Sequence, residues 1–121
     1  MSLGGVFVQI STVGIENTAT ILKLLGDKTR LTMVKMLDTN DCCVCEFVEI
    51  FKVSQPAISQ HVRRLKDAGL VQETRKGQWI IYSLNKDSDY YPLVHNLLQH
   101  LPNQDFKLKE LEEQGLRISC D

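Results

Sequence analysis

Two short apolar helix patterns separated by a tight turn constrain the fold of this chain more than any other feature. Positions 44, 47, 48 and 51 are apolar, which is the spacing of one buried helix face, so we expect a helix over about 42–51. Ser54 can cap a second helix that starts near Gln55, and Pro56 is tolerated in a first turn whose N–H groups lack partners. These residues predict two helices joined by a turn.

The second of these helices has one apolar face and one polar face. Its inward positions are Ile58, Val62, Leu65 and Ala68, at helical spacing. Its outward positions are Ser59, Gln60, Arg63 and Arg64. The pair of helices therefore predicts a helix-turn-helix with a polar outer face.

The segments around this unit complete the expected fold. A helix over residues 16–25 ends near Gly26, and Asp27 caps another whose core positions are Leu31, Met33, Val34, Met36 and Leu37. Two β-rich runs, 70–74 and 79–84, flank the basic segment 75–78 and predict a hairpin. A last helix starting near Ser88 or Asp89 carries the stripe Leu93, Val94, Leu97, Leu98 and Leu101 before Pro102.

The fold class that follows is mainly α with a small β-hairpin, a winged helix-turn-helix. A chain of 121 residues builds one modest core, so an apolar helix left over is best covered by a second subunit, and we expect a homodimer. The expected organisation is a mobile N-terminal arm over 1–14 that resembles a tag remnant at its start, a DNA-binding and dimerisation domain over 15–102, and a C-terminal tail over 103–121 with one more short helix.

The charge of the chain is unevenly distributed. The net charge is −1, but residues 52–86 hold seven Lys or Arg against two acidic residues, a local +5. This basic block coincides with the second helix and the hairpin, which indicates double-stranded DNA as a partner. From the helix, Ser59, Gln60, His61 and Arg63 can reach bases or phosphates, and from the hairpin tip Arg75, Lys76 and Gln78 can reach the backbone or the minor groove. An ordinary packed or surface role for His61 stays open.

Three of the four cysteines lie within residues 42–45, and the fourth is Cys120. Disulfides among such close neighbours would be badly strained, so we expect reduced thiols. The sequence shows no secretory signal and no apolar run near the roughly 18 residues of a spanning helix. We therefore expect a cytoplasmic protein that does not associate with a membrane.

The cluster of Cys42, Cys43 and Cys45 is a candidate set of metal ligands. A single buried cysteine often serves as a small hydrophobic residue. Here three cysteines lie within four positions at an expected helix start. Because a helix start lowers the thiol pKa, it favours thiolates, and thiolates bind soft metals and metalloids. Thiol redox sensing is the main alternative. A structural zinc is disfavoured, because zinc prefers four ligands and this span has three cysteines and no histidine.

The order of elements and several motifs in residues 21–84 resemble the ArsR/SmtB family of metal-sensing repressors, and more closely its arsenical-responsive members. The matching motifs are Leu24-Leu25-Gly26-Asp27-Lys28-Thr29-Arg30, Cys43-Val44-Cys45-Glu46, Ser54-Gln55-Pro56-Ala57-Ile58-Ser59-Gln60-His61, Leu65-Lys66-Asp67-Ala68-Gly69-Leu70-Val71 and Gly77-Gln78-Trp79-Ile80-Ile81-Tyr82.

The resemblance implies a homodimer, paired through its first and last helices, that holds operator DNA when metal-free and releases it when the inducing ion binds. It implies no constitutive cofactor, an As(III) or Sb(III) inducer bound by Cys43 and Cys45, and Ser54, Gln55 and Ala57 as further DNA-binding residues. A repressor responsive to Cd(II) or Pb(II) stays open as an alternative. No grouping of nucleophile, base and oxyanion donors and no phosphate loop is visible, so we do not expect an enzyme.

The chain departs from the family pattern at three points. Val48 stands where some arsenical repressors have a third cysteine, so Cys42 or Cys120 must complete a three-sulfur site; we favour Cys42, because ordering a tail costs entropy. No cysteine precedes Cys42, unlike in cadmium- and lead-sensing relatives. His95 and His100 are five positions apart and far around a helix from each other, so we expect them to be structural or exposed.

Overall fold

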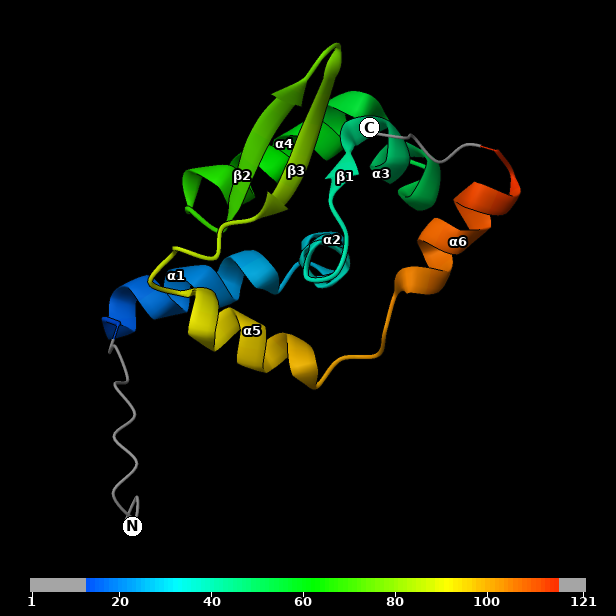
Figure 1. The fold of residues 1–121 in the computed structure, drawn as a ribbon. Helices are drawn as coiled ribbons and strands as arrows, with labels where there is room; N and C mark the ends of the chain where they lie inside the picture. Colours follow the sequence, from blue (N-terminus) through cyan, green and yellow to red (C-terminus); the bar gives the residue numbers. More distant parts are fainter. Residues whose placement is uncertain (1–12, 116–121) are drawn as a thin grey trace.

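The computed structural model describes residues 13–115, and the helices and strands of this part follow the expected order (Figure 1). The elements are α1 (Ile15–Leu25), α2 (Lys28–Leu37), β1 (Cys42–Cys43), α3 (Val44–Phe51), α4 (Gln55–Asp67), β2 (Val71–Lys76), β3 (Trp79–Leu84), α5 (Tyr91–Gln99) and α6 (Asp105–Glu113). They confirm a mainly α winged helix-turn-helix. In these residues no helix is long and apolar enough to cross a membrane.

The local signals at the starts of α2 and α4 are confirmed. The Asp27 carboxylate accepts a hydrogen bond from the Arg30 backbone N–H at 3.0 Å, and the Ser54 hydroxyl accepts one from the Ala57 N–H at 3.3 Å. Each side chain satisfies a backbone donor that a helix start leaves without a partner. The turn between α3 and α4 passes through Lys52, whose left-handed φ of 56° ends α3.

The expected helix over 42–51 is wrong at its start. Cys42 and Cys43 form strand β1, which pairs antiparallel with β3, opposite Tyr82 and Ile81, and α3 begins only at Val44. The reason is a reciprocal cap: Glu46 Oε1 accepts from the Cys43 N–H at 3.0 Å, and the Cys43 side chain accepts from the Glu46 N–H. This arrangement fixes Cys43 as the residue before the helix, in extended conformation.

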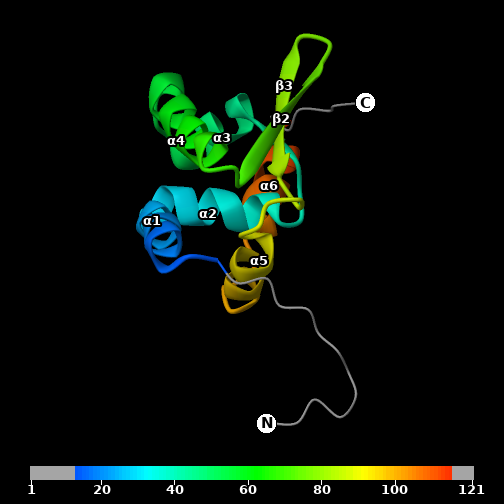
Figure 2. The same ribbon diagram turned by 90° about the vertical axis from the view of Figure 1, so that its left-hand side faces the viewer.

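The three strands form one small sheet in the order β1-β3-β2. Strands β2 and β3 make the expected hairpin, paired from Val71–Leu84 to Lys76–Trp79, and Gly77 takes a φ of +60° at its tip. The hairpin extends beyond the helices, while α3 and α4 lie to one side of it (Figures 1 and 2). The strand that carries two cysteines is therefore part of the wing sheet.

Helix α5 begins later than expected, at Tyr91 rather than Ser88 or Asp89. The preceding residues form a turn, in which the Ser88 hydroxyl accepts from the Tyr90 N–H at 3.1 Å and the Ser88 carbonyl accepts from the Tyr91 N–H at 3.0 Å. Pro92 then occupies the first turn of the helix, where a missing N–H costs nothing. Val94 and Leu98 are buried, and Leu93 is exposed.

Helix α6 confirms the expected short helix in the tail and is packed against the domain. The Asp105 carboxylate accepts hydrogen bonds from Thr39 Oγ1 and Asn40 Nδ2, both at 2.9 Å, just before β1. Leu108 and Leu111 are buried, and α6 contacts α3. The helix that bears Cys45 is therefore covered by a segment from the C-terminal part of the chain.

Candidate metal centre and nucleic-acid interface

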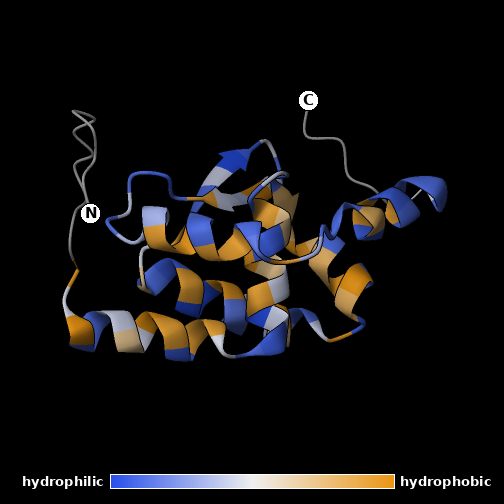
Figure 3. Ribbon diagram, turned by 90° about the horizontal axis from the view of Figure 1, so that it is seen from below, coloured by the Kyte–Doolittle hydropathy of each residue, from blue (hydrophilic) through white to orange (hydrophobic). Residues whose placement is uncertain are grey.

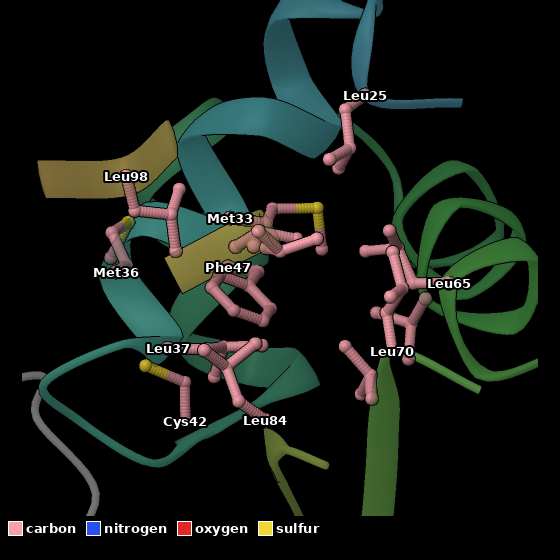
Figure 4. Close-up of a cluster of buried hydrophobic side chains, with 14 of the residues drawn as sticks. Leu25, Met33, Met36, Leu37, Cys42, Phe47, Leu65, Leu70, Leu84 and Leu98 are labelled. Atoms are coloured by element: carbon pink, nitrogen blue, oxygen red, sulfur yellow. The ribbon is translucent and has the colours of Figure 1, made fainter. Parts of the chain in front are cut away.

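Cys42 and Cys43 are adjacent in β1 and point to opposite faces of the sheet, because strand side chains alternate. Cys42 is fully buried in the main apolar core, in the cluster that also contains Leu37 and Leu84 (Figure 4). Cys43 is also buried but lies outside that core cluster. The two neighbouring sulfurs therefore do not converge on one point in this conformation.

Cys43 lies where the sheet meets α3. Its backbone N–H donates to the buried Glu46 carboxylate, and its side chain faces the Glu46 N–H. The pKa of the Cys43 thiol is raised to about 11, mainly by burial and to a smaller extent by the neighbouring Glu46 carboxylate, against the hydrogen bond from the Glu46 backbone, which lowers it. The expectation that the helix start lowers this pKa is wrong, because loss of solvation outweighs the helix-end contribution.

Cys45 lies in the first turn of α3 and is exposed. It is close enough for its negative charge to oppose ionisation of Cys43, so these two sulfurs occupy the same region. Among residues 13–115, no group of three His, Cys, Asp or Glu side chains is already assembled as a metal site. Cys120 lies outside the described residues. The described part of the chain thus supplies a two-thiol unit, Cys43 with Cys45.

This two-thiol unit has structural connections in two directions. Through β1 it is hydrogen-bonded to β3 of the hairpin, and through α3 and the turn over 52–54 it leads to α4. Helices α3 and α4 also pack directly on each other. A rearrangement at Cys43 and Cys45 would therefore change the positions of both the hairpin and α4.

The outer face of α4 is exposed as expected. Ser59, Gln60 and Arg63 are exposed along it, Ser54 and Gln55 are exposed at its start, and Ala57 is half-buried. Arg75, Lys76 and Gln78 are exposed at the hairpin tip. These side chains present polar and cationic groups on one helix and one projecting hairpin, which is the arrangement that reads DNA in winged helices.

His61 differs from its neighbours on α4. It is half-buried, and its Nδ1 lies 3.1 Å from Nη1 of Arg30 on α2. Two cations near the outer face were absent from the expected set. Arg64 is exposed beside a groove between α1 and α4, and Lys66 pairs with Glu73 of β2. Helical spacing had already placed Arg64 on the outward face without assigning it a DNA contact, whereas the contact between Arg30 and His61 joins residues 31 positions apart.

The two histidines in and just after α5, His95 and His100, lie apart from each other. His95 Nδ1 is 3.2 Å from the Asp38 carboxylate at the end of α2, and its ring stacks on Tyr91 with centroids 5.3 Å apart. His100 is exposed just beyond α5. This arrangement agrees with structural and exposed roles.

Residues 27–73 match the family described as bacterial regulatory protein, arsR family. The chain is 33% identical over 100 residues to the arsenical resistance operon repressor of Staphylococcus xylosus, which covers 83% of this chain and 86% of that protein. It is 38% identical over 68 residues to the arsenic resistance transcriptional regulator ArsR1 of Pseudomonas putida, a match that covers 55% of this chain and about half, 53%, of that protein.

A solved structure supports the same relationship. The transcriptional repressor BigR from Xylella fastidiosa matches with a TM-score of 0.62 and 28% identity, over 69% of this chain and 82% of that chain.

The environments of Cys45 and Cys43 predict which of the two is alkylated first. In a Cys120→Ser variant at pH 7.5, iodoacetamide should modify Cys45 first and Cys43 at least about a hundredfold more slowly, because Cys43 is buried and its raised pKa leaves little thiolate. Time-resolved peptide mass mapping would measure both rates. In urea the two alkylation rates should converge, because unfolding exposes both thiols. Equal rates for Cys43 and Cys45 in the folded protein would contradict the described environment.

Proposed function

The chain belongs to the arsR family of bacterial regulatory proteins, and we propose that it is a transcriptional repressor that holds operator DNA when ligand-free and releases it when its thiols bind As(III) or Sb(III). The single observation that carries the proposal is the position of Cys43 and Cys45, between the wing sheet and the helix-turn-helix. Two relatives, one named as an arsenic resistance transcriptional regulator and one as an arsenical resistance operon repressor, support the choice of inducer.

We propose that the repressor acts as a homodimer paired through α1 and α5. Ile15 and Leu22 on α1 are 87% and 50% exposed, and Leu93 on α5 is 40% exposed. Seen from below, hydrophobic residues run along both helices (Figure 3). Covering these side chains with a second copy would remove apolar surface from water. A two-fold dimer would then present two α4 helices to half-sites about 34–36 Å apart.

We propose that inducer binding acts by disturbing the start of α3. Cys43 is extended and buried, whereas Cys45 is exposed in the first helical turn, so we expect an ion that binds both sulfurs to draw Cys43 away from its cap position. That movement would weaken the Glu46 cap and the pairing of β1 with β3. Reversing a 99:1 preference takes about 5.5 kcal/mol. Thiolate coordination of structural metals reaches roughly 10–16 kcal/mol, which is sufficient.

The described environment of Cys42 changes our choice of a third sulfur. Cys42 points into the core, so recruiting it would require β1 to turn over and would open space beside Leu37 and Leu84. We therefore propose Cys120 as the third ligand in place of Cys42.

The position of α6 makes this assignment feasible within one subunit. Gln114 at the end of α6 lines a groove with Glu49 and Lys52 of α3, and Gly115 then takes a φ of +71°, which ends the helix. We estimate that the end of α6 lies about 14 Å from Cys45. This follows if α3 rises about 1.5 Å per residue between Cys45 and Lys52 and the two helices are spaced about 8–10 Å apart. The five residues that follow Gly115, up to and including Cys120, can span at most about 17 Å when extended.

The buried, protonated state of Cys43 favours As(III) over the alternatives. Arsenous acid reacts with three thiols to give three As–S bonds and three water molecules, so it releases no net proton. A divalent ion such as Cd(II) must instead expel a proton from each thiol that it binds. Oxidation by peroxide also requires thiolate, so burial protects Cys42 and Cys43 against a redox switch.

Release of DNA tests the proposed repressor. A duplex selected by the ligand-free protein from a random pool should carry an inverted repeat, and arsenite should release it. Cys43→Ser and Cys45→Ser should keep affinity within about threefold but lose arsenite release, because serine retains the fold and offers no sulfur. Fluorescence anisotropy would measure both, with Cys42→Ser as the matched control that keeps release. If no duplex is selected, or if both variants still respond to arsenite, the proposal fails.

Sulfur coordination tests the third ligand. X-ray absorption of the arsenite complex should give three As–S bonds in the wild-type protein and in Cys42→Ser, and two in Cys120→Ser. The opposite pattern, with the third sulfur lost in Cys42→Ser, would restore Cys42 as the ligand. Mixed dimers of Cys120→Ser with Cys43→Ser would show whether the third sulfur comes from the same subunit or from the partner.

The pH dependence of binding separates the inducers. Because the Cys43 pKa is raised to about 11, this thiol is protonated throughout pH 6–8, and each thiol proton expelled by Cd(II) should tighten apparent affinity about tenfold per pH unit. As(III) affinity should change by less than about threefold over the same range, since no net proton is released. Isothermal titration in buffers of different ionisation enthalpy would count the protons. Equal pH slopes for the two ions would contradict this assignment.

A further inference from the structure

Arg30 joins three elements through one mostly buried side chain. Its guanidinium is part of a side chain only 11% exposed, at the start of α2. Nε donates to the Leu24 carbonyl of α1 at 2.7 Å, and Nη1 lies 3.1 Å from His61 Nδ1 of α4 and 4.0 Å from the Asp27 carboxylate. A buried guanidinium is stable only when its donors are used, so these contacts define a fixed position.

The contact with Arg30 restricts the tautomer of His61 that can form a hydrogen bond. A guanidinium has donors and no acceptor, so a hydrogen bond between Arg30 Nη1 and His61 Nδ1 requires Nδ1 to accept, with the ring proton on Nε2. Protonation would place an N–H against an N–H and a second positive charge about 3 Å from Arg30. The contact therefore exists only with neutral histidine.

We propose that Arg30 and neutral His61 form a brace that holds the reading helix α4 against the junction of α1 and α2, in the orientation that binds operator DNA. The brace depends on the proposed function in one respect: affinity for DNA is the property by which its effect is measured. Leu24 belongs to the helix proposed for dimerisation, so the brace also ties the direction of α4 to the subunit interface. Arg30 and His61 are positioning residues, and neither is assigned a contact with DNA.

The charges around His61 make the sign of a pH effect informative. Asp27 faces both Arg30 and His61, whose positive charges contribute, after the hydrogen bond from the Arg30 backbone N–H, to lowering the Asp27 pKa. Lys23, Arg64 and Asp67 line the groove that Arg30 also lines. A histidine that merely faced DNA would increase affinity when protonated, because it would add a positive charge. Protonation of the brace would instead break its hydrogen bond and lower affinity. The two roles predict opposite changes.

The experiment uses the full-length protein and a labelled duplex that the wild-type protein selects from a random pool at pH 7.5. Between pH 7.5 and 5.5, where histidines gain protons, wild-type affinity should fall about tenfold or more relative to His61→Asn. Asparagine places an acceptor oxygen near the Nδ1 position and does not titrate. His61→Leu has no acceptor and should bind about tenfold more weakly than His61→Asn at pH 7.5.

Three controls separate positioning from other effects. A variant with His95→Gln and His100→Gln should keep the wild-type pH profile, which assigns the effect to His61. Arg30→Gln should lower affinity without changing the salt dependence, whereas Arg64→Gln, on the exposed side of the same groove, should reduce the slope of log K against log salt by about one. Circular dichroism would verify that each variant is folded.

A DNA-free measurement keeps the brace testable if the proposed function fails. Long-range ¹H–¹⁵N spectra of the free protein should show His61 as the Nε2–H tautomer, with the Nδ1 resonance shifted in Arg30→Gln. Three results would overturn the brace: an Nδ1–H tautomer, equal pH profiles for the wild-type protein and His61→Asn, or tighter wild-type binding at low pH. Failure to select any duplex would overturn the repressor proposal and leave the tautomer result to decide on the brace.

Discussion

The pairing of β1 with β3 is the interaction on which the rest of the structure depends. Two residues, Cys42 and Cys43, hold the start of α3 against the wing, and the reciprocal cap with Glu46 fixes where the strand stops and the helix begins. Because strand side chains alternate, this short pairing also separates a core cysteine from one at the edge of the helix. Cys43, a proposed sensing residue, is thus part of the framework that orients the hairpin and α4.

Most of the architecture follows from local signals in the sequence. Asp27, Ser54 and Pro56 mark helix starts through unmet backbone donors, and the apolar spacing of α4 identifies its buried face. The same reasoning misplaced residues 42–43, because an apolar helix pattern and a short buried strand look alike over two residues. The cap itself was visible in the sequence as a Cys three positions before Glu46, although serine or threonine is the usual partner.

The candidate site was predictable in composition but less so in geometry. Grouped cysteines indicate soft-ligand chemistry, and the sequence places them beside the helix-turn-helix. The spacing of cysteines in a sequence does not show how exposed each thiol is to solvent. In the structure, burial raises the pKa of Cys43, and Cys42 lies in the apolar core. The contact between Arg30 and His61 was also out of reach, because it joins two helices whose relative position only tertiary packing determines.

The docking of α6 separates two kinds of change that the sequence can undergo. Asp105 accepts hydrogen bonds from Thr39 and Asn40, and α6 contacts α3, so these contacts of the helix lie outside α4 and the hairpin. Substitutions that alter how the C-terminal segment meets α3 need not alter the residues that face DNA. If the proposed function holds, inducer preference and operator preference can therefore diverge independently, with the same fold serving different ions at the same promoter or the same ion at different ones.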